Sequence, residues 1–503
     1  MSGKRQLLWQ IVAVGGLTLL GKAGAFGKDV LLSLLFGAGM ETDAYFIAYA
    51  IPGLVLAGIL TTISLVFLPI YSRAQASSTN EPLTIIKTAT IVYLGLALTI
   101  SILTAAFAGQ LIPLVARGAS EEARALATFL TRLFAIGFIF SGWVALQNAI
   151  LQANKSFIWP MAIPVFNHSI VITSMLLIMY WGGSIIYVVA SVVFGWVLLS
   201  PIAGLIASRY YSLRTSPPYS KKVARNLVLL SIPVFFSISL DQINAVIDLA
   251  FGSNFGQGAI SHLSYASRLA ILLSGLFSLV ISYFIFPYLA DSLAKEDTAQ
   301  SRKLVSRGLS GVIILTTPLV ILCSIKSEGL VTLVFQRGQF SVQDMETTAL
   351  VLRYYAIGIL FVGVREVLNR VFLANQQVKT ILSFGVIAAI INVATSLYFM
   401  SRIGLPGIAL GTACSAISYV ALQVSTLVLY SRQLLSWQPL VYLGISLAAG
   451  TVMIFSMNSL SSMEYFAPGN LRFILEFLLS IGAYFIVLTI FIVIPRRLSH
   501  LIN

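Results

Sequence analysis

The chain has 503 residues, of which 58% are hydrophobic and only 10% are charged, and its net charge is +14. Soluble globular domains carry about 25% charged residues, so the composition excludes an ordinary soluble protein. The basic residues are scattered over short loops, as in the cytoplasmic loops of membrane proteins, and do not form the patch that nucleic-acid binding needs. We therefore expect an all-α polytopic membrane protein.

Apolar runs long enough to cross a bilayer follow one another along the whole sequence. In chain order they predict about fourteen transmembrane helices, near residues 7–36, 43–71, 83–109, 123–152, 158–181, 185–208, 227–254, 259–290, 304–325, 346–373, 380–401, 407–430, 437–458 and 472–494.

The loops between these spans differ in charge. Residues 209–226 contain five basic residues and no acidic one. Other basic residues follow the eighth span or lie near the termini: Lys295, Arg302, Lys303, Arg307, Lys4, Arg5, Arg496 and Arg497. The positive-inside rule then predicts that both termini and the loops after even-numbered spans are cytoplasmic.

A weak internal repeat relates residues 36–71 to residues 251–288. The two copies begin with "FGAG" and "FGSN", and each has a Tyr-Ala pair in its middle. The offset of about six spans gives both copies the same orientation, as in transporters built from parallel repeats. We predict an N-lobe at 1–210, a C-lobe at 226–430 and two further helices at 437–495. Chance similarity between apolar helices is the alternative.

Several charged residues lie inside predicted spans, where a charge is costly and usually faces a cavity or a partner, and three of these cations stand out. Lys22 and Lys28 lie among glycines in "GKAGAFGKD", where a helix can bend, and Arg268 lies in the eighth span. If the spans share a cavity, it would favour a phosphate or diphosphate. The alternative is snorkelling or pairing with a neighbouring charge, which we expect for Arg365, Glu366 and Arg370.

Asp248, Asn392 and Thr412 bring oxygen-bearing side chains into spans 7, 11 and 12. Such oxygens suit a hard cation such as sodium, although Asn and Thr also form hydrogen bonds between transmembrane helices. The sequence contains no Walker A loop and no HExxH motif, so we expect a transporter without an enzymatic centre or a bound cofactor other than a sodium ion.

Five stretches resemble the MurJ (MviN) family of lipid II flippases, within the MATE-like multidrug/oligosaccharidyl-lipid/polysaccharide exporter superfamily. They are "GKAGAFGKDVLLSLLFGAGMETDAYFIAYAIP" (21–52), "DLAFGSNFGQGAISHLSYASRL" (248–269), "FPYLA" (286–290), "LVFQRGQFSVQD" (333–344) and "YYAIGILFVGVREVLNRVFLANQQVKT" (354–380). They occur in the family's order and spacing over most of residues 1–430.

The resemblance implies fourteen helices in two lobes around a cationic cavity. It also implies transport of an undecaprenyl-diphosphate-linked peptidoglycan precursor to the outer leaflet by alternating access. Lys22 and Lys28 match functional arginines of the family's first helix, Asp43 its acidic residue at the start of helix 2, and Arg268 its helix 8 arginine. Asp248, Asn392 and Thr412 match its sodium site, where Ser396 replaces another Asp.

The resemblance further implies a multi-pass protein of the bacterial inner membrane, whose partners are the lipid-linked substrate and membrane lipids. We expect a monomer, with helices 13 and 14 (437–495) forming a groove for the lipid tail.

The sequence departs from the family in the presumed cavity. Lysines replace both first-helix arginines, the basic pair after Pro52 is absent, and Ser267 replaces the Asp before the helix 8 arginine. These differences favour, as an alternative, a flippase for another polyprenyl-diphosphate-linked oligosaccharide, as in exopolysaccharide or O-antigen pathways. A MATE-like cation exporter would need acidic cavity residues. A membrane glycosyltransferase would need an acidic group in an outer loop such as 326–345.

Overall fold

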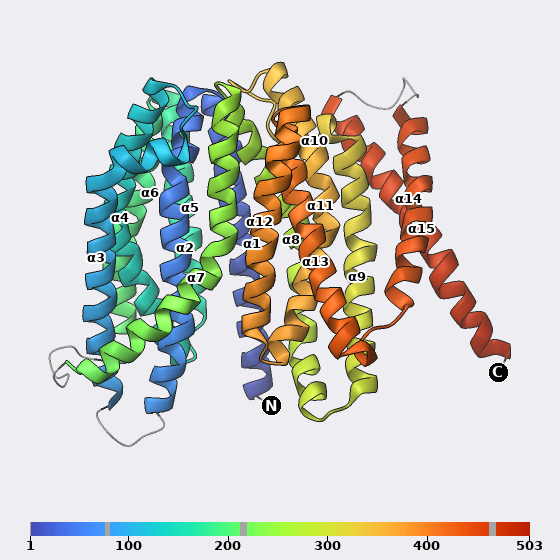
Figure 1. The fold of residues 1–503 in the computed structure, drawn as a ribbon, viewed down its shortest axis with the longest axis horizontal. Coiled ribbons are helices and arrows are strands. Elements are labelled where there is room, and N and C mark those ends of the chain that lie inside the picture. Colours follow the sequence, from blue (N-terminus) through green and yellow to red (C-terminus); the bar gives the residue numbers. More distant parts are fainter. Residues whose placement is uncertain (1, 76–80, 212–218, 462–468, 503) are drawn as a thin grey trace. The chain divides into compact units, whose positions relative to one another are not determined.

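The structure is a computed structural model, and it describes residues 2–75, 81–211, 219–461 and 469–502. Every regular element in these ranges is a helix (Figure 1). Fourteen of the described α-helices have 23 residues or more, and they match the fourteen predicted spans in order. The expected all-α fold is therefore confirmed.

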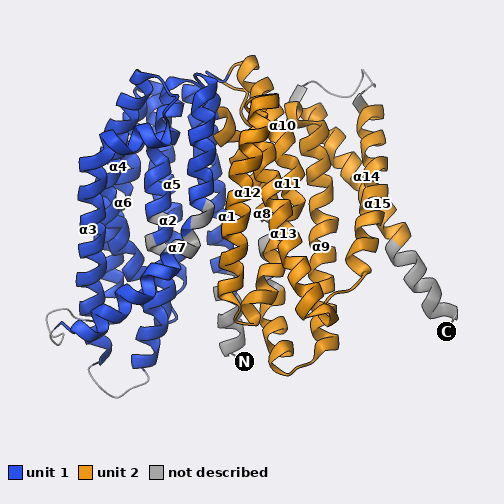
Figure 2. Cartoon of the chain, in the orientation of Figure 1, with its two compact units in different colours: residues 1–261, 338–340 blue, residues 262–337, 341–503 orange. Residues whose placement is uncertain are grey.

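The chain divides into two compact units, drawn in different colours in Figure 2. Unit 1 comprises Met1–Ser261 and Gly338–Phe340. Its helices are α1 (Ser2–Phe36), α2 (Met40–Gln75), α3 (Glu81–Val115), α4 (Glu121–Ala153), α5 (Ile158–Trp181), α6 (Ile185–Ala207), α7 (Lys221–Gly252) and the short 3-10 helix η1 (Ser253–Phe255).

Unit 2 comprises His262–Arg337 and Ser341–Asn503. It holds most of α8 (Ala259–Ala294), then α9 (Thr298–Ile325), α10 (Ser327–Val334), α11 (Val342–Ala374), α12 (Val378–Ile403), α13 (Pro406–Tyr430), the 3-10 helix η2 (Arg432–Leu434), α14 (Gln438–Ser461) and α15 (Gly469–Ile502).

Ten helices of the described chain are long and apolar enough to cross a membrane. The other four long helices, α1, α2, α7 and α8, coincide with predicted spans and include positions whose side chains lie outside the described residues. Residues 212–218 and the side chains of the basic residues near the termini also lie outside them, namely Lys4, Arg5, Arg496 and Arg497. The predicted orientation therefore remains a prediction.

Each unit has its own apolar core. In unit 1, buried side chains such as Ile63, Phe67 and Phe138 bring α2, α3, α4, α6 and α7 together. In unit 2, side chains such as Val371 and Phe372 join α8, α9, α11, α12 and α13.

Helix α7 shows where the units differ from the predicted lobes. It packs against α2 and α3 and so belongs to unit 1, whereas the predicted C-lobe begins at 226. The unit boundary at Ser261 lies one helix later in the chain. The lobes defined by the repeat at 1–210 and 226–430, with 437–495, stay a prediction.

Several helix starts follow from local capping. The Ser120 hydroxyl accepts a hydrogen bond from Ala123 N, and the Asp297 carboxylate accepts one from Gln300 N. At α11, Ser341 and Asp344 form a reciprocal capping box, which satisfies two backbone N–H groups at once. This capping box lies at the end of the predicted outer loop 326–345. Most of the first half of that loop forms the helix α10.

Candidate functional site

The helix α1 is continuous from Ser2 to Phe36, so the glycines of "GKAGAFGKD" do not unwind it. Gly21, Gly24 and Gly27 instead face α5, and a Cβ added to Gly24 would lie 3.0 Å from the His168 Cβ. Small residues at such spacing let two transmembrane helices approach closely. The glycines therefore bring α1 against α5 within a continuous helix.

Lys28 is buried in unit 1 on the packed part of α1. Its ammonium donates a hydrogen bond to the Tyr45 hydroxyl at 3.1 Å and lies 3.4 Å from the Asp29 carboxylate. It also lies 5.6 Å from the ring centroids of both Tyr45 and Tyr49, which stack 6.2 Å apart. We call Lys28, Asp29, Tyr45 and Tyr49 the Lys28 cluster.

The Lys28 cluster explains how a charge is tolerated inside an apolar helix bundle. Lys28 and Asp29 are only 7% and 4% exposed. A buried cation needs a counter-charge and hydrogen bonds to offset the loss of its hydration, and aromatic faces add a favourable cation–π term. Lys28 is thus a compensated cation rather than an isolated positive charge.

Lys22 has the opposite environment, although it lies only six residues away. Its side chain is exposed and forms neither a hydrogen bond nor an ion pair with any residue that the structure describes. Its neighbours Leu19 and Leu20 are also exposed. A lysine without a partner keeps its full capacity to donate to an anion, since the ammonium has three donors.

The tyrosines and His168 are the parts of this region that the sequence interpretation missed. His168 packs against Gly24 from α5 and lies close enough to Lys28 and Asp29 to interact with them electrostatically. The sequence interpretation treated His168 as an ordinary polar residue. The Tyr-Ala pair of the repeat, which contains Tyr49, was the available signal for the tyrosines.

Asp43 binds the beginning of α8. One carboxylate oxygen accepts a hydrogen bond from Gly258 N at 2.6 Å, and the other accepts one from Ser261 N at 2.8 Å. The Ser261 hydroxyl lies 2.6 Å from the same oxygen. These N–H groups have no partner within a helix at its first turn, and a carboxylate there is stabilised by the helix dipole. Asp43 therefore acts as a cap supplied from α2.

A second contact fixes the end of α1 beside the stretch "QRGQF" of the family resemblance. Gln339 N donates to the Leu34 carbonyl oxygen at 2.9 Å. Gly37 and Gly338 both have positive φ, and a Cβ on either would collide with the backbone of the other segment. Glycine is required at both positions because it alone combines this conformation with so close an approach.

The remaining predicted site residues fall in different surroundings. Arg268 lies half-buried in α8, within unit 2, so it and the two lysines belong to different units. Asn392 Nδ2 donates to Thr412 Oγ1 at 3.2 Å inside unit 2, whereas Asp248 belongs to unit 1. The structure thus brings together two of the three predicted sodium ligands within one unit.

The charges predicted to pair among themselves do so. Glu366 contacts Arg365 at 3.6 Å and Arg370 at 3.9 Å. No group of three or more His, Cys, Asp or Glu side chains with metal-site geometry occurs among the residues that the structure describes.

Comparison with known proteins places this arrangement in a family. The family model "Lipid II flippase MurJ" matches residues 32–482. The chain is 25% identical over 424 residues to lipid II flippase MurJ of Burkholderia cenocepacia, which covers 81% of each protein. The match to the family model begins at Leu32, after both lysines of α1.

Solved structures show the same fold. A lipid II flippase MurJ in an inward closed conformation superposes with a TM-score of 0.81 at 24% identity, covering 96% of this chain and 98% of that one. An inward-facing multidrug resistance MATE family transporter of the MOP superfamily gives a TM-score of 0.70 at 14% identity, covering 84% and 98%. Since the family model covers most of the sequence, this chain belongs to the lipid II flippase MurJ family.

Proposed function

We propose that this protein is a flippase that moves lipid II from the inner to the outer leaflet of the bacterial inner membrane by alternating access. The family match over residues 32–482 carries the proposal. The named relatives are flippases rather than enzymes, and the ten apolar spans among the described residues fit a multi-pass membrane protein.

Lys22, Lys28 and Arg268 would bind the diphosphate of the substrate. Lys22 supports this role because its ammonium has no partner among the described residues. Lys28 would share its charge between the substrate and Asp29, from which it lies 3.4 Å away. Arg268 would supply the bidentate donor that suits a phosphate. Asp43 would act indirectly, by holding the first turn of α8, the helix that carries Arg268.

A sodium ion would be held by oxygens of α12 and α13. Asn392 Oδ1 and Ser396 Oγ are buried and have no hydrogen-bond partner among the described residues, and Thr412 Oγ1 lies beside Asn392. These neutral oxygens suit a hard cation. Asp248 would add the negative charge that balances the ion. Sodium would be the ion whose gradient drives transport.

Two features of the topology complete the proposal. Both termini would be cytoplasmic, because the basic residues gather in the loops after even-numbered spans. The helices α14 and α15, within 437–495, would form a groove for the lipid tail, and the protein would act as a monomer without nucleic-acid partners.

One observation favours a second candidate, a flippase for another polyprenyl-diphosphate-linked oligosaccharide. Lysines stand where the family resemblance expects arginines, and Lys28 is held as a point charge by Asp29 and Tyr45. Lysine and arginine are not interchangeable where a planar bidentate donor is needed. The headgroup would then differ from lipid II while the diphosphate stays the same.

A cell depleted of its own lipid II flippase separates the two candidates. This protein, expressed in that cell, should restore the labelling of lipid II at the outer surface. The variant Lys22→Gln, expressed at the same level, should not restore this labelling. If the wild-type protein does not restore labelling but restores export of another lipid-linked glycan in a matching depleted strain, the second candidate holds and the lipid II assignment is wrong.

A further inference from the structure

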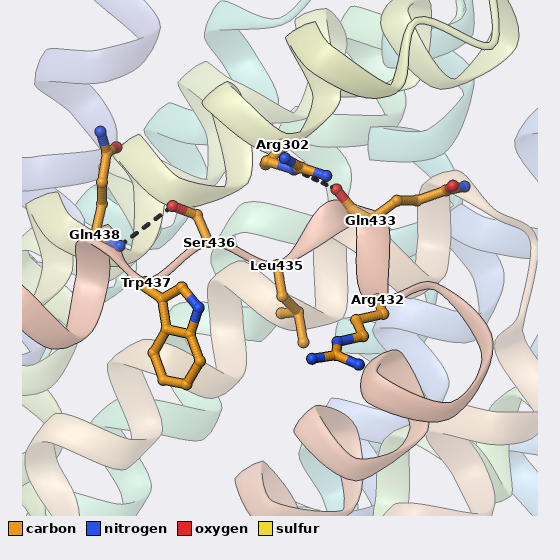
Figure 3. Close-up of a pocket in the computed structure, with 7 residues that line it drawn as sticks. All are labelled: Arg302, Arg432, Gln433, Leu435, Ser436, Trp437 and Gln438. Atoms are coloured by element: carbon orange, nitrogen blue, oxygen red, sulfur yellow. Dashed lines mark hydrogen bonds between the residues drawn. The ribbon is translucent and has the colours of Figure 1, made fainter.

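A basic pocket lies at one end of unit 2, where α9, η2 and the start of α14 meet (Figure 3). Its cavity has a volume of about 590 Å³, within the usual range of about 300–1,000 Å³ for small-molecule sites. The lining residues carry two arginines and no acidic group: Arg302, Arg432, Gln433, Leu435, Ser436, Trp437 and Gln438. We call this cavity the α9–α14 pocket.

The walls of the α9–α14 pocket are held by hydrogen bonds. Arg302 Nε donates to the Gln433 carbonyl oxygen, and Gln438 N donates to Ser436 Oγ, as Figure 3 shows. Ser306 Oγ on α9 also hydrogen-bonds with Gln438 Oε1 at 3.0 Å. The turn between α13 and α14 is therefore anchored on α9.

Both arginines keep donors for a ligand. Arg302 uses its Nε for the wall, and a guanidinium has four further N–H donors on its terminal nitrogens. The Arg432 side chain forms no hydrogen bond or ion pair with the residues that the structure describes. Two guanidinium groups beside one cavity, without a carboxylate among the lining residues, favour a phosphate.

The pocket lies at the connection between two candidate membrane spans. The helices α13 and α14 are both candidate spans, and residues 431–437 connect them. Tyr430 and Trp437 flank this connection and are 81% and 78% exposed, as in the aromatic belts at membrane interfaces. Leu440 and Val441 are exposed as well, so exposed apolar side chains of α14 follow directly after the lining residues Trp437 and Gln438 in the chain.

We propose that the α9–α14 pocket binds the headgroup of an anionic glycerophospholipid of the bilayer. Arg302 and Arg432 hold the phosphate, Trp437 lies at the level of the glycerol, and the acyl chains follow α14 past Leu440. The juxtaposition of two arginines with an exposed apolar helix face selects a lipid over a soluble phosphate. Basic pockets between transmembrane helices commonly bind anionic headgroups. The inference is independent of the transported substrate.

Native mass spectrometry of the full chain in detergent tests the proposal with two lipids of identical acyl chains. Phosphatidylglycerol should bind the wild-type protein, and phosphatidylcholine should not compete with it. Each basic residue near an anionic lipid contributes about fivefold in binding, so the double variant Arg302→Gln with Arg432→Gln should lose phosphatidylglycerol by about 25-fold.

The matched control is the double variant Arg73→Gln with Arg209→Gln, which removes two exposed arginines at helix ends of unit 1. It should bind phosphatidylglycerol like the wild type. Equal losses of phosphatidylglycerol binding in both double variants, or no loss in the first, would overturn the site.

The variant Leu440→Gln tests the path of the acyl chains. It should weaken the binding of phosphatidylglycerol, and unchanged binding would contradict this path. Displacement of the lipid by equimolar glycerol 3-phosphate would instead identify a soluble-anion site and overturn the lipid assignment.

Discussion

The two parts of α1 carry the same residue in opposite environments. Around Lys28 the helix is packed: Gly24 and Gly27 contact α5, and the ammonium is enclosed by Asp29, Tyr45 and Tyr49. Around Lys22 the helix is exposed, as at Leu19 and Leu20. Six residues rotate a side chain to a position about 120° away around the helix axis, so the two lysines point in different directions.

The difference shows that a charged residue within an apolar span can either stabilise the fold or remain available to bind a ligand. Lys28 has the partners that burial requires, so removing it disturbs the fold as well as any bound anion. Lys22 has no partner among the described residues, so its role must lie outside the packing of unit 1. Variants of these residues and of their contacts can distinguish the structural role from the binding role, beginning with the largest expected effect.

Lys28→Ala should be the most destabilising change in α1. It leaves Asp29 buried without its counter-charge, and breaking a buried ion pair in this way costs about 3–5 kcal/mol. Thermal unfolding in detergent, followed by helical circular dichroism, measures the loss. The double variant Lys28→Ala with Asp29→Ala should recover much of the stability, and Lys22→Ala should unfold like the wild type. A Lys28→Ala protein as stable as Lys22→Ala would show that the cluster is not a structural unit.

Asp43→Asn should have the next largest effect, about 1–3 kcal/mol, because an amide presents a donor to backbone N–H groups that need an acceptor. Hydrogen exchange should become faster at residues 258–261, the first turn of α8. The control is Glu41→Gln, two residues earlier, whose side chain forms no hydrogen bond or ion pair with the described residues. Unchanged exchange at 258–261 would mean that the cap from α2 is dispensable.

Gly24→Ala should lower stability by about 1 kcal/mol, since overpacking a close contact is destabilising. The new methyl group would lie 3.0 Å from the His168 Cβ. Gly16→Ala in the same helix should stabilise by up to about 1 kcal/mol, because no atom lies within 4 Å and alanine is the better helix former. Only glycine at 168 lacks the contacting Cβ, so combining Gly24→Ala with His168→Gly should cost less than the sum of the two single variants. If both single variants behave alike, α1 does not pack on α5 through its glycines.

The fold followed from the sequence because hydropathy is a local property. The twelfth span was expected at 407–430 and α13 spans Pro406–Tyr430; the first was expected at 7–36 and α1 spans Ser2–Phe36. Contacts between distant residues could not be foreseen in this way. Asp43 caps a helix that begins more than 200 residues later, and the glycines of α1 pack against α5.

The candidate site was foreseen in part for the same reason. A lysine in an apolar run is visible in the sequence, so Lys22 and Lys28 could be named. That Lys28 is buried while Lys22 is exposed depends on which side of α1 packs against α2 and α5. No local sequence pattern specifies this side. The α9–α14 pocket was not foreseen either, because it joins Arg302 to Gln433, which lies 131 residues further along the chain.

The central claim is that the exposed lysine of α1 binds the diphosphate of a lipid-linked precursor. Lipid II binding to the purified chain tests it most directly, because Lys22 can be changed without disturbing the packing. A hydrogen bond to a charged group contributes about 1.5–3 kcal/mol, so Lys22→Gln should weaken lipid II binding by about tenfold or more, and Lys22→Arg should retain it. Equal affinity of wild type and Lys22→Gln for lipid II would contradict the claim.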